Sequence, residues 1–423
     1  MARASFALRW IPAFAGMTLT AGMTLAFAAP LTLEEALRLA ESRSPQLAAQ
    51  RASADAAAAL IPAAGQNPDP KLIAGVENLP VDGEDRWSLT RDFMTMRKVG
   101  VMQEFMRGAK LDARTARQDA EARREAALVE MQRAELRREV ATAWLERLYA
   151  ARSRSLVDAL LAEARLQSEA STAELAAGRG SAADALASRA LRATLLDKQL
   201  EVDRMSRRAE AMLSRWLGDD AAREPVSPPD LSRLAHHGAA DLEANLDRHP
   251  HLAMYAPMIE MAQADLRMAE AGKQPDWSVE VSYAQRGAGF GNMASVMFRM
   301  DLPVFGARRQ DPAIQSKRAA LEQARAQADD ARRKHLAEIR VSLAEWEVAQ
   351  SRLERQRNDI VPYAEERARL AQSAYAGGRA DLAMVFDARR MALDARMNAL
   401  AAEAELARAW AQLAYLIPER SKQ

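Results

Sequence analysis

The chain has 423 residues, of which 49% are hydrophobic and 28% are charged, and 59 Lys and Arg nearly balance 58 Asp and Glu. This balance gives no basis for a nucleic-acid-binding surface, and a mean hydropathy of −0.30 is too polar for a bundle of membrane helices. The absence of cysteine excludes disulfides, thiolate metal sites, cysteine nucleophiles and a lipidated N-terminal cysteine in the mature chain.

The first 28 residues have the pattern of a signal peptide. Arg3 and Arg9 precede a mostly apolar stretch that ends in Ala26-Phe27-Ala28, an A-x-A cleavage pattern. The alternative is a membrane anchor, but a proline and two glycines interrupt the apolar part. No later stretch reaches the roughly 18 apolar residues of a membrane-spanning helix. The sequence therefore predicts a cleaved signal peptide at 1–28 and export from the cytoplasm.

The rest of the chain reads as two copies of one plan. Residues 44–76 and 249–281 both open with x-P-x-L-A, continue as an alanine-rich helix and end in a Pro/Asp break before strand-like residues. Three further matches keep an offset close to 200: Phe105 with Phe305, Trp144 with Trp346, and Ala177-Gly178-Arg179 with Gly377-Gly378-Arg379. The repetition indicates a tandem duplication. We expect repeats at 29–223 and 239–418, a Pro-rich linker at 224–238 and a tail at 419–423.

Each copy begins with a helix, about 32–64 and about 240–272, followed by two strands. The strands are expected at 71–76 and 99–105, and at 277–284 and 295–302, with Pro303 ending the last one. Apolar side chains alternate with polar or charged ones in the second copy: Trp277, Val279, Val281, Tyr283, Val296, Phe298, Met300 and Leu302 against Ser278, Glu280, Ser282, Ala284, Met297, Arg299 and Asp301. Such alternation fits a barrel in lipid and equally a small soluble sheet with one buried face.

A very long helix follows each strand pair, at about 107–177 and about 307–377. Seventy helical residues form a rod of about 105 Å, which must lie against other long helices. The residues expected to face those neighbours are Leu136, Val140, Trp144 and Leu148, and in heptad spacing Ile339, Trp346, Leu353 and Ile360. Four strands cannot close a barrel, and open strand edges are costly in lipid, so strands in a membrane require several chains to share one barrel.

This order of elements, with three segments in particular, resembles the TolC family of outer-membrane efflux proteins. The segments are DLPVFGARR (301–309), AAGRGSAADAL (176–186) and YAGGRADLAMVFDA (375–388). The resemblance implies a mainly α fold with a small β part. Long hairpins would form a periplasmic α-barrel, and four strands would contribute to a trimeric 12-stranded β-barrel. It also implies a homotrimer in contact with outer-membrane lipid, a periplasmic adaptor and an inner-membrane pump of the RND type.

The two turns between long helices are the candidate docking tips for the adaptor. They contain Gly178, Arg179 and Ser181 in the first copy and Gly377, Gly378 and Arg379 in the second. Glycine also serves a tight reversal without any docking role. Asp184, Tyr375 and Asp387 match family positions at the constricted periplasmic entrance, where carboxylates would form rings that favour cations. Met384 departs from the family pattern, which places an acidic residue there.

The segment from Glu77 to Phe105 resembles members of the family associated with copper and other heavy metals. It contains Met94, Met96 and Met102, and Met106 follows it, which makes these four residues weak candidates for metal ligands. Methionine more often fills cores. His236, His237, His249 and His251, near the linker, are expected at the surface.

The sequence contains no H-E-x-x-H, P-loop or G-x-S-x-G motif, so neither an enzyme nor a cofactor is expected. The predicted function is the exit duct of a tripartite efflux system for heavy-metal cations such as copper or silver. Drug export and type I protein export by the same family are alternatives. A periplasmic coiled-coil adaptor or scaffold is the alternative from a different class.

Overall fold

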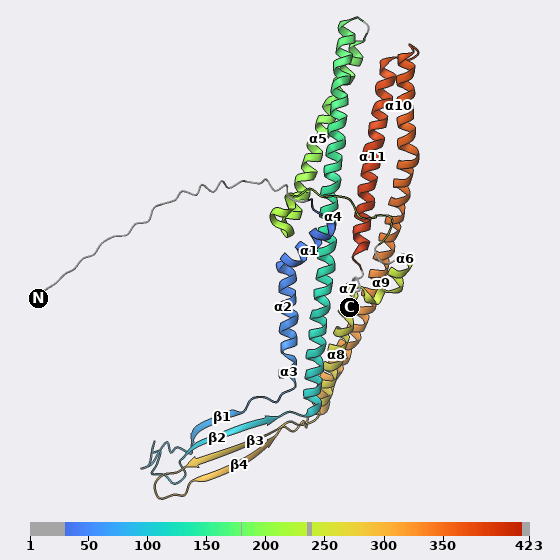
Figure 1. Ribbon diagram of the computed structural model, residues 1–423. Coiled ribbons are helices and arrows are strands. Elements are labelled where there is room, and N and C mark those ends of the chain that lie inside the picture. The colour runs from blue at the N-terminus through green and yellow to red at the C-terminus, as the bar shows by residue number, and fades with distance from the viewer. Residues whose placement is uncertain (1–29, 179, 235–238, 417–423) are drawn as a thin grey trace, which may run out of the picture.

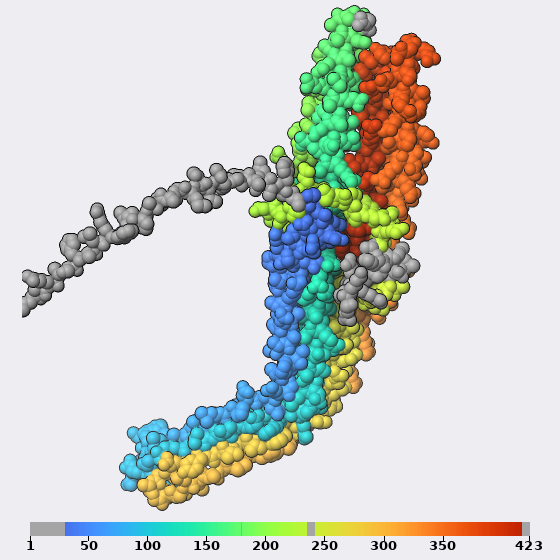
Figure 2. Space-filling model, viewed as in Figure 1, coloured from blue at the N-terminus to red at the C-terminus, as the bar shows by residue number. Residues whose placement is uncertain are grey.

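The computed structural model describes residues 30–178, 180–234 and 239–416. The predicted signal peptide, Arg179, His236, His237 and the predicted tail therefore lie outside the described residues. Two long helical hairpins run side by side, and at one end the chain bends away from them into a four-stranded sheet (Figures 1 and 2). Within the described chain, none of the helices is both long enough and apolar enough to cross a membrane.

The first half contains three short helices, two strands and the first hairpin. These are α1 (Leu33–Arg43), α2 (Pro45–Ala59), α3 (Ile61–Ala64), β1 (Lys71–Glu77), β2 (Met96–Phe105), α4 (Gly108–Ala176), α5 (Ala182–Leu217) and the 3₁₀ turn η1 (Gly218–Ala222). Helix α4 has 69 residues, so it is about 104 Å long at 1.5 Å per residue. The rod expected from the sequence is therefore present at nearly its predicted bounds.

The second half repeats this order. It contains α6 (Ala239–Ala244), η2 (Leu246–Arg248), α7 (Pro250–Ala253), α8 (Tyr255–Ala271), β3 (Trp277–Gln285), β4 (Met293–Met300), η3 (Gly306–Arg308), α9 (Gln310–Arg355), η4 (Gln356–Ile360), α10 (Val361–Ala376) and α11 (Leu382–Ala414). The four strands form one antiparallel sheet in the order β1-β2-β3-β4, so the sheet joins the two halves of the chain through the β2–β3 pair.

Two tryptophans at equivalent places anchor extended segments to the long helices. The Trp144 indole donates a hydrogen bond to the Leu31 carbonyl (3.1 Å), and the Trp346 indole donates one to the Leu231 carbonyl (3.2 Å). Leu31 and Leu231 are 200 residues apart, and both are buried. Leu231 lies inside the stretch expected to be linker, so we propose that the ordered part of the second copy begins there.

The largest hydrophobic core lies where these segments cross the hairpins. It contains Val140, Trp144 and Leu148 of α4, together with Leu213 of α5 and Trp410 of α11. The predicted stripe of α4, Leu136 to Leu148, is therefore buried as expected. Because residues of both halves contribute, this core holds the two hairpins to one another.

The helices expected as single units at 32–64 and 240–272 are each broken. Ser44 separates α1 from α2 because a residue before proline is driven to extended geometry, and its side chain then caps α2 by accepting from the Leu47 N–H (3.2 Å). In the second copy, His249 plays the same backbone role before Pro250. Strand β4 ends at Met300, so Leu302 lies outside the strand in which it was expected.

The second long helix contains a π turn, η4, between α9 and α10. Pro362 is the second residue of α10 and lacks the N–H that a continuous α-helix would use at that position. A π turn adds a residue to one turn and so rotates everything beyond it. Ile339 and Leu353 are buried, but Ile360 is 40% exposed, so the predicted heptad fails at its last member.

Candidate functional site

The apolar face of the sheet is uncovered. The register places Val101, Val281 and Val296 opposite one another on it. Leu72 is 75% and Val296 is 76% exposed, and Phe298 on the same face is also exposed. In Figure 1 the helices stand at the root of the sheet and lie over neither of its faces. A soluble sheet with one buried face would not leave these side chains exposed in the folded chain, so their exposure favours strands with lipid on one side.

The far ends of the two hairpins are built alike. At the end of α10, Gly378 has φ = 68°, the Gly378 N–H donates to the Tyr375 carbonyl (2.9 Å), and the Arg379 N–H donates to the Ala374 carbonyl (2.8 Å). This pair of bonds is a Schellman motif, which requires a left-handed residue at the position of Gly378. Gly377 has φ = −85°, an ordinary conformation. The reversal therefore depends on the second glycine.

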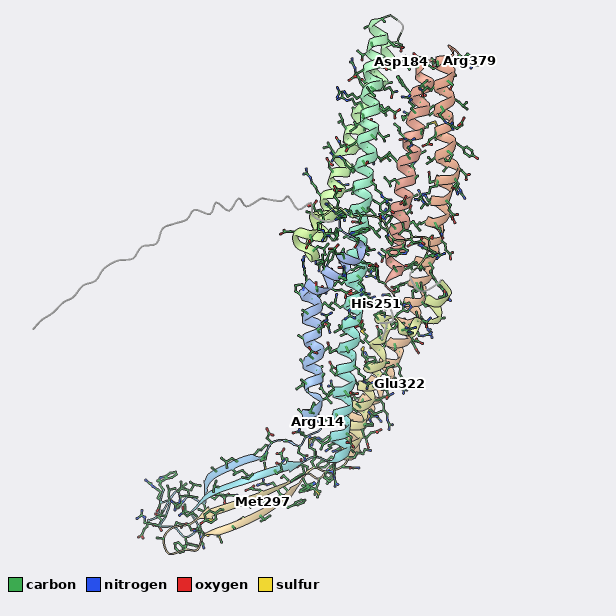
Figure 3. All side chains as sticks on the ribbon, viewed as in Figure 1. Arg114, Asp184, His251, Met297, Glu322 and Arg379 are labelled. Atoms are coloured by element: carbon green, nitrogen blue, oxygen red, sulfur yellow. The ribbon has the colours of Figure 1, made fainter. Side chains whose placement is uncertain are left out.

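The first hairpin uses the same geometry. Gly178 has φ = 71°, and its N–H donates to the Leu175 carbonyl (3.1 Å). Ser181 then caps α5 by accepting from the Asp184 N–H (3.1 Å). At the other tip Asp381 caps α11 by accepting from the Met384 N–H (2.8 Å). Asp184 and Arg379 both lie at the hairpin ends that are farthest from the sheet (Figure 3).

Two polar contacts join the hairpins near these ends. The Tyr375 hydroxyl on α10 donates to Glu174 Oε1 on α4 (3.0 Å). Further along, Arg389 of α11 forms an ion pair with Glu163 of α4 (3.0 Å). The structure thus brings Tyr375, a predicted entrance residue, into direct contact with the other hairpin.

The two predicted entrance aspartates differ in their surroundings. Asp184 is half-buried and accepts a hydrogen bond from the Ser181 hydroxyl (2.8 Å), so it supports the helix cap. Asp387 is exposed and lies 4.0 Å from Arg390. It lines a groove of about 810 Å³ between α4, α5 and α11, together with Leu191 and Leu393. Asp387 is therefore the freer carboxylate of the two.

Sequence reasoning missed Glu174 and Asp381. Asp381 was detectable, because it lies 200 residues after Ser181 and has the same place in the repeat. Glu174 had no comparable signal, since its role depends on the approach of a helix from the other half of the chain. Met384, where an acidic residue was expected, is exposed one turn beyond that cap.

The C-terminal half matches a known protein family. Residues 242–417 match the family described as outer membrane efflux protein. This part of the chain, from α6 to α11, is therefore similar to outer membrane efflux proteins. No curated protein sequence shows significant similarity to it.

Solved structures share the fold over nearly their full length. A membrane protein from Pseudomonas aeruginosa is 18% identical with a TM-score of 0.77, over 91% of this chain and 93% of that one. CusC is 14% identical with a TM-score of 0.79, over 93% and 94%. The outer membrane protein VceC from Vibrio cholerae is 19% identical with a TM-score of 0.74, over 91% and 95%. The α-barrel and β-barrel fold class expected from the sequence is thus confirmed.

The four candidate methionines do not converge. Met96 and Met102 lie six residues apart on β2, which is about 20 Å along a strand. The Met102 sulfur accepts from Arg299 (3.2 Å), and the Met106 sulfur accepts from Arg114 (3.2 Å). Met94 lies in the loop before β2 and is exposed. Among the residues that the structure describes, no group of three or more His, Asp or Glu is arranged to hold a metal ion.

The expectation of surface histidines is wrong for His249, which is fully buried. Its Nε2 lies 3.1 Å from the Leu242 carbonyl and its Nδ1 lies 3.0 Å from Nε2 of His335. A carbonyl can only accept, so Nε2 of His249 carries the proton and Nδ1 accepts from His335. Burial lowers the pKa of His335, although the nearby Glu338 carboxylate opposes this. Sequence gave no sign of this pair, because its members are 86 residues apart.

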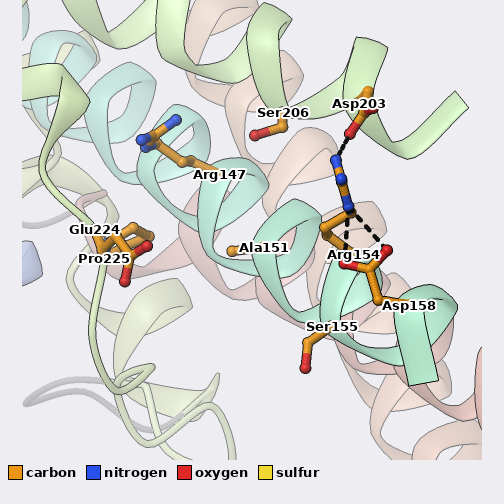
Figure 4. A pocket seen from close by; sticks show the side chains of 9 residues that line it. All are labelled: Arg147, Ala151, Arg154, Ser155, Asp158, Asp203, Ser206, Glu224 and Pro225. Carbon is orange, nitrogen blue, oxygen red and sulfur yellow. Dashed lines mark hydrogen bonds and ion pairs between the residues drawn. The ribbon is translucent and has the colours of Figure 1, made fainter. Parts of the chain in front are cut away.

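A pocket of about 440 Å³ lies between α4 and α5, beside Glu224 and Pro225 (Figure 4). Its arginines already have partners. Arg154 pairs with Asp158 (3.0 Å) and with Asp203, and Arg147 pairs with Glu210 (2.9 Å) outside the pocket. The charges of this pocket thus serve the packing of the hairpin.

Proposed function

We propose that this protein is an outer-membrane efflux protein and the exit duct of a tripartite efflux system, with three copies sharing one twelve-stranded barrel. The observation that carries the proposal is the uncovered apolar face of a sheet with two open edges. Within the described residues β1 pairs with β2 alone and β4 with β3 alone. An unpaired backbone group costs several kcal/mol in lipid, so strands with lipid on one side favour closure by further copies.

The tips would dock on a periplasmic adaptor, which connects the duct to an inner-membrane pump of the RND type. Support comes from the exposure of Gly178, Ser181, Gly377, Gly378 and Arg379 at the hairpin ends, together with the resemblance of both tip segments to the TolC family. Arg179 belongs to the same proposal on sequence grounds.

The entrance would be gated at the same end. The Tyr375–Glu174 bond and the Arg389–Glu163 pair hold the second hairpin against the first. Exposed Asp387, repeated in three copies, would place carboxylates around the axis and favour cations. Opening would require that the two polar contacts break, because both join elements that would have to separate.

Heavy-metal cations such as copper or silver are the proposed substrate. The support is the resemblance of Glu77–Phe105 to metal-efflux members of the family. Since the methionines do not converge, the proposal assigns the duct no metal ligand, and the pump would select the cargo. Drug export and type I protein export are the alternatives. The adaptor alternative has lost its support, because the chain carries the efflux-protein fold over its described length.

Two experiments test these proposals. Outer-membrane fractions of cells that express the full-length chain should contain a heat-modifiable trimer, and a soluble periplasmic monomer would overturn the shared barrel. Separately, deletion of the gene should lower tolerance to copper and silver, with zinc and a panel of drugs measured in parallel. Unchanged metal tolerance with lost drug tolerance would overturn the substrate and leave the duct intact.

A further inference from the structure

The polar face of the sheet carries a line of alternating charges with one member on each strand. The members are Glu77 on β1, Lys98 on β2, Glu280 on β3 and Arg299 on β4. Lys98 Nζ lies 2.9 Å from Glu77 Oε1 and 2.8 Å from Glu280 Oε1, and Arg299 Nη2 lies 2.6 Å from Glu280 Oε2. We call these four residues the charge ladder.

The middle and the ends of the charge ladder differ. The side chains of Lys98 and Glu280 are 12% and 2% exposed, and each is paired on both sides. The side chains of Glu77 and Arg299 are 47% and 49% exposed. Glu77 pairs with Lys98 and Arg299 pairs with Glu280, so the partner of each lies toward the middle of the sheet. The ladder therefore presents a negative end at the β1 edge and a positive end at the β4 edge.

We infer that the charge ladder continues from copy to copy, with Arg299 of one chain pairing with Glu77 of the next. This inference rests on the proposed function, in which β4 of one copy pairs with β1 of another. Such a contact is head-to-tail, and it closes into a ring when the rotation between copies allows. Three copies would then form one ring of twelve alternating charges inside the barrel.

The register of the strands supports this pairing. Glu77 is opposite Met96, two residues from Lys98, and Lys98 is opposite Ala284, four residues from Glu280. Glu280 is in turn opposite Met297, two residues from Arg299. The ladder therefore descends along the strands as it crosses the sheet, as a line around a barrel of tilted strands does.

The stagger between copies has a suitable size. Strands in barrels tilt by about 35–45°, so four strands at 4.8 Å correspond to a stagger of about four to six residues. From Glu77 to Arg299 the ladder descends eight residues along the strands. If the stagger between copies runs in the same direction, Glu77 of the next copy lies roughly two to four residues along the strand from Arg299. Lys98 and Arg299 already bridge offsets of four and two residues within one chain. The contact between copies thus needs no longer reach than the contacts inside the sheet.

The ring would fix the register of the barrel seam. A slip of one residue at the β4–β1 seam would turn every side chain to the other face, and a slip of two would separate the ladder ends. It would also leave this belt of the lumen without net charge, because each carboxylate has a cation beside it.

Chemical cross-linking tests the inference, since the natural chain has no cysteine. In Glu77→Cys/Arg299→Cys, the two thiols of one chain lie about 30 Å apart, three strand spacings across and eight residues along. A short bismaleimide can therefore join them only between copies. The matched control is Glu77→Cys/Phe298→Cys, because Phe298 is next to Arg299 on the same strand but is on the opposite, apolar face of the sheet.

The expected result is covalent dimers and trimers from the 77/299 pair and few from the 77/298 pair. Linkage of 77/298 alone, or of neither pair in assembled trimers, would overturn the ring. Absence of any trimer in the unmodified chain would instead reject the shared barrel of the proposed function.

A second measurement applies if the cysteine variants do not assemble. Glu77→Gln and Arg299→Gln are compared singly and together by the temperature at which the trimer dissociates. A contact between copies predicts that the double change lowers this temperature by less than the sum of the single changes. Additive shifts would overturn the inference, because charged groups in direct contact couple.

Discussion

The hydroxyl of Tyr375 donates a hydrogen bond to the carboxylate of Glu174, 201 residues away, and so ties the tip of one hairpin to the tip of the other. A hydrogen bond to a charged group contributes about 1.5–3 kcal/mol. The bond can be removed by the loss of a single oxygen atom from Tyr375.

We expect Tyr375→Phe to raise the conductance of the purified channel in planar bilayers, because the two hairpins would separate more readily. Tyr363→Phe is the matched control, since Tyr363 is on the same helix and is exposed. Equal conductance of Tyr375→Phe and the unmodified protein would show that this bond does not hold the entrance.

Substitution by alanine is expected to destabilise the tip at Gly378 but not at Gly377. Gly378→Ala forces a β-carbon into left-handed geometry, at a cost of about 1–2 kcal/mol. Gly377→Ala leaves an ordinary conformation, and the new Cβ would meet nothing closer than Arg379 Nε at 3.4 Å. Hydrogen exchange of the 374–384 peptide should accelerate about 5- to 30-fold for Gly378→Ala and stay unchanged for Gly377→Ala. Equal effects would contradict the Schellman geometry.

Two histidines, His335 and His251, predict a loss of stability in acid. Burial lowers the pKa of His335. Burial also lowers the pKa of His251. The carboxylate of Glu135 on α4 opposes the shift of His251, whereas His335 and Arg138 of α4 increase it. Both folded-state pKa values lie below the unfolded value of 6.5, so the unfolded chain binds more protons as the pH falls through 6.5. Stability is therefore complete above that pH and declines below it.

His335→Gln should flatten this decline when the thermal midpoint of the protein is measured between pH 7.5 and pH 5. Glu338, whose carboxylate lies 3.5 Å from His335 Nδ1, remains in the variant. Any pH dependence caused by this carboxylate alone would therefore persist in His335→Gln. A pH profile as steep as that of the unmodified protein would place the acid sensitivity elsewhere.

Glu403 on α11 is the centre of a further link between the hairpins. It accepts from Tyr149 (3.1 Å) and Arg152 (2.8 Å) of α4 and from Arg357 (2.5 Å) of the π turn. Glu403→Gln removes the charge that all three donors share, and we expect a loss of about 2–3 kcal/mol in the free energy of unfolding. Glu405→Gln, whose exposed carboxylate pairs with Arg352, should change it by less than about 1 kcal/mol. Equal effects would show that Glu403 acts as an ordinary surface ion pair.

The parts of the fold that depend on local patterns could be predicted from the sequence. Val279, Val281, Val296 and Phe298 share one face because strand side chains alternate, and Leu136 to Leu148 are buried because helix periodicity places them on one stripe. The tips were predictable because Gly178 and Gly378 interrupt good helix formers at equivalent places.

What could not be predicted depends on contacts between distant segments or on a local competition. The Tyr375–Glu174 bond and the His249–His335 pair each join elements that only the folded chain brings together. Pro45 and Pro250 did give a signal, since the residue before a proline resists helix, but the alanine-rich surroundings suggested continuous helices. The burial of Ile360 was mispredicted because a heptad count assumes an unbroken α-helix, whereas the π turn rotates Ile360 away from the buried stripe.

The two hairpins of the duplicated chain differ in length, and this difference affects how a partner can bind their tips. From the indole anchor to the left-handed glycine, the first arm runs from Trp144 to Gly178 and the second from Trp346 to Gly378, so the second is two residues shorter. Its π turn shortens it further, and Figure 1 shows the second hairpin ending below the first. In a tube of three such chains, longer and shorter hairpins would alternate around the rim. A partner that surrounds the rim would meet two kinds of hairpin tip, three of each, and identical partner molecules would have to bind them in two different ways.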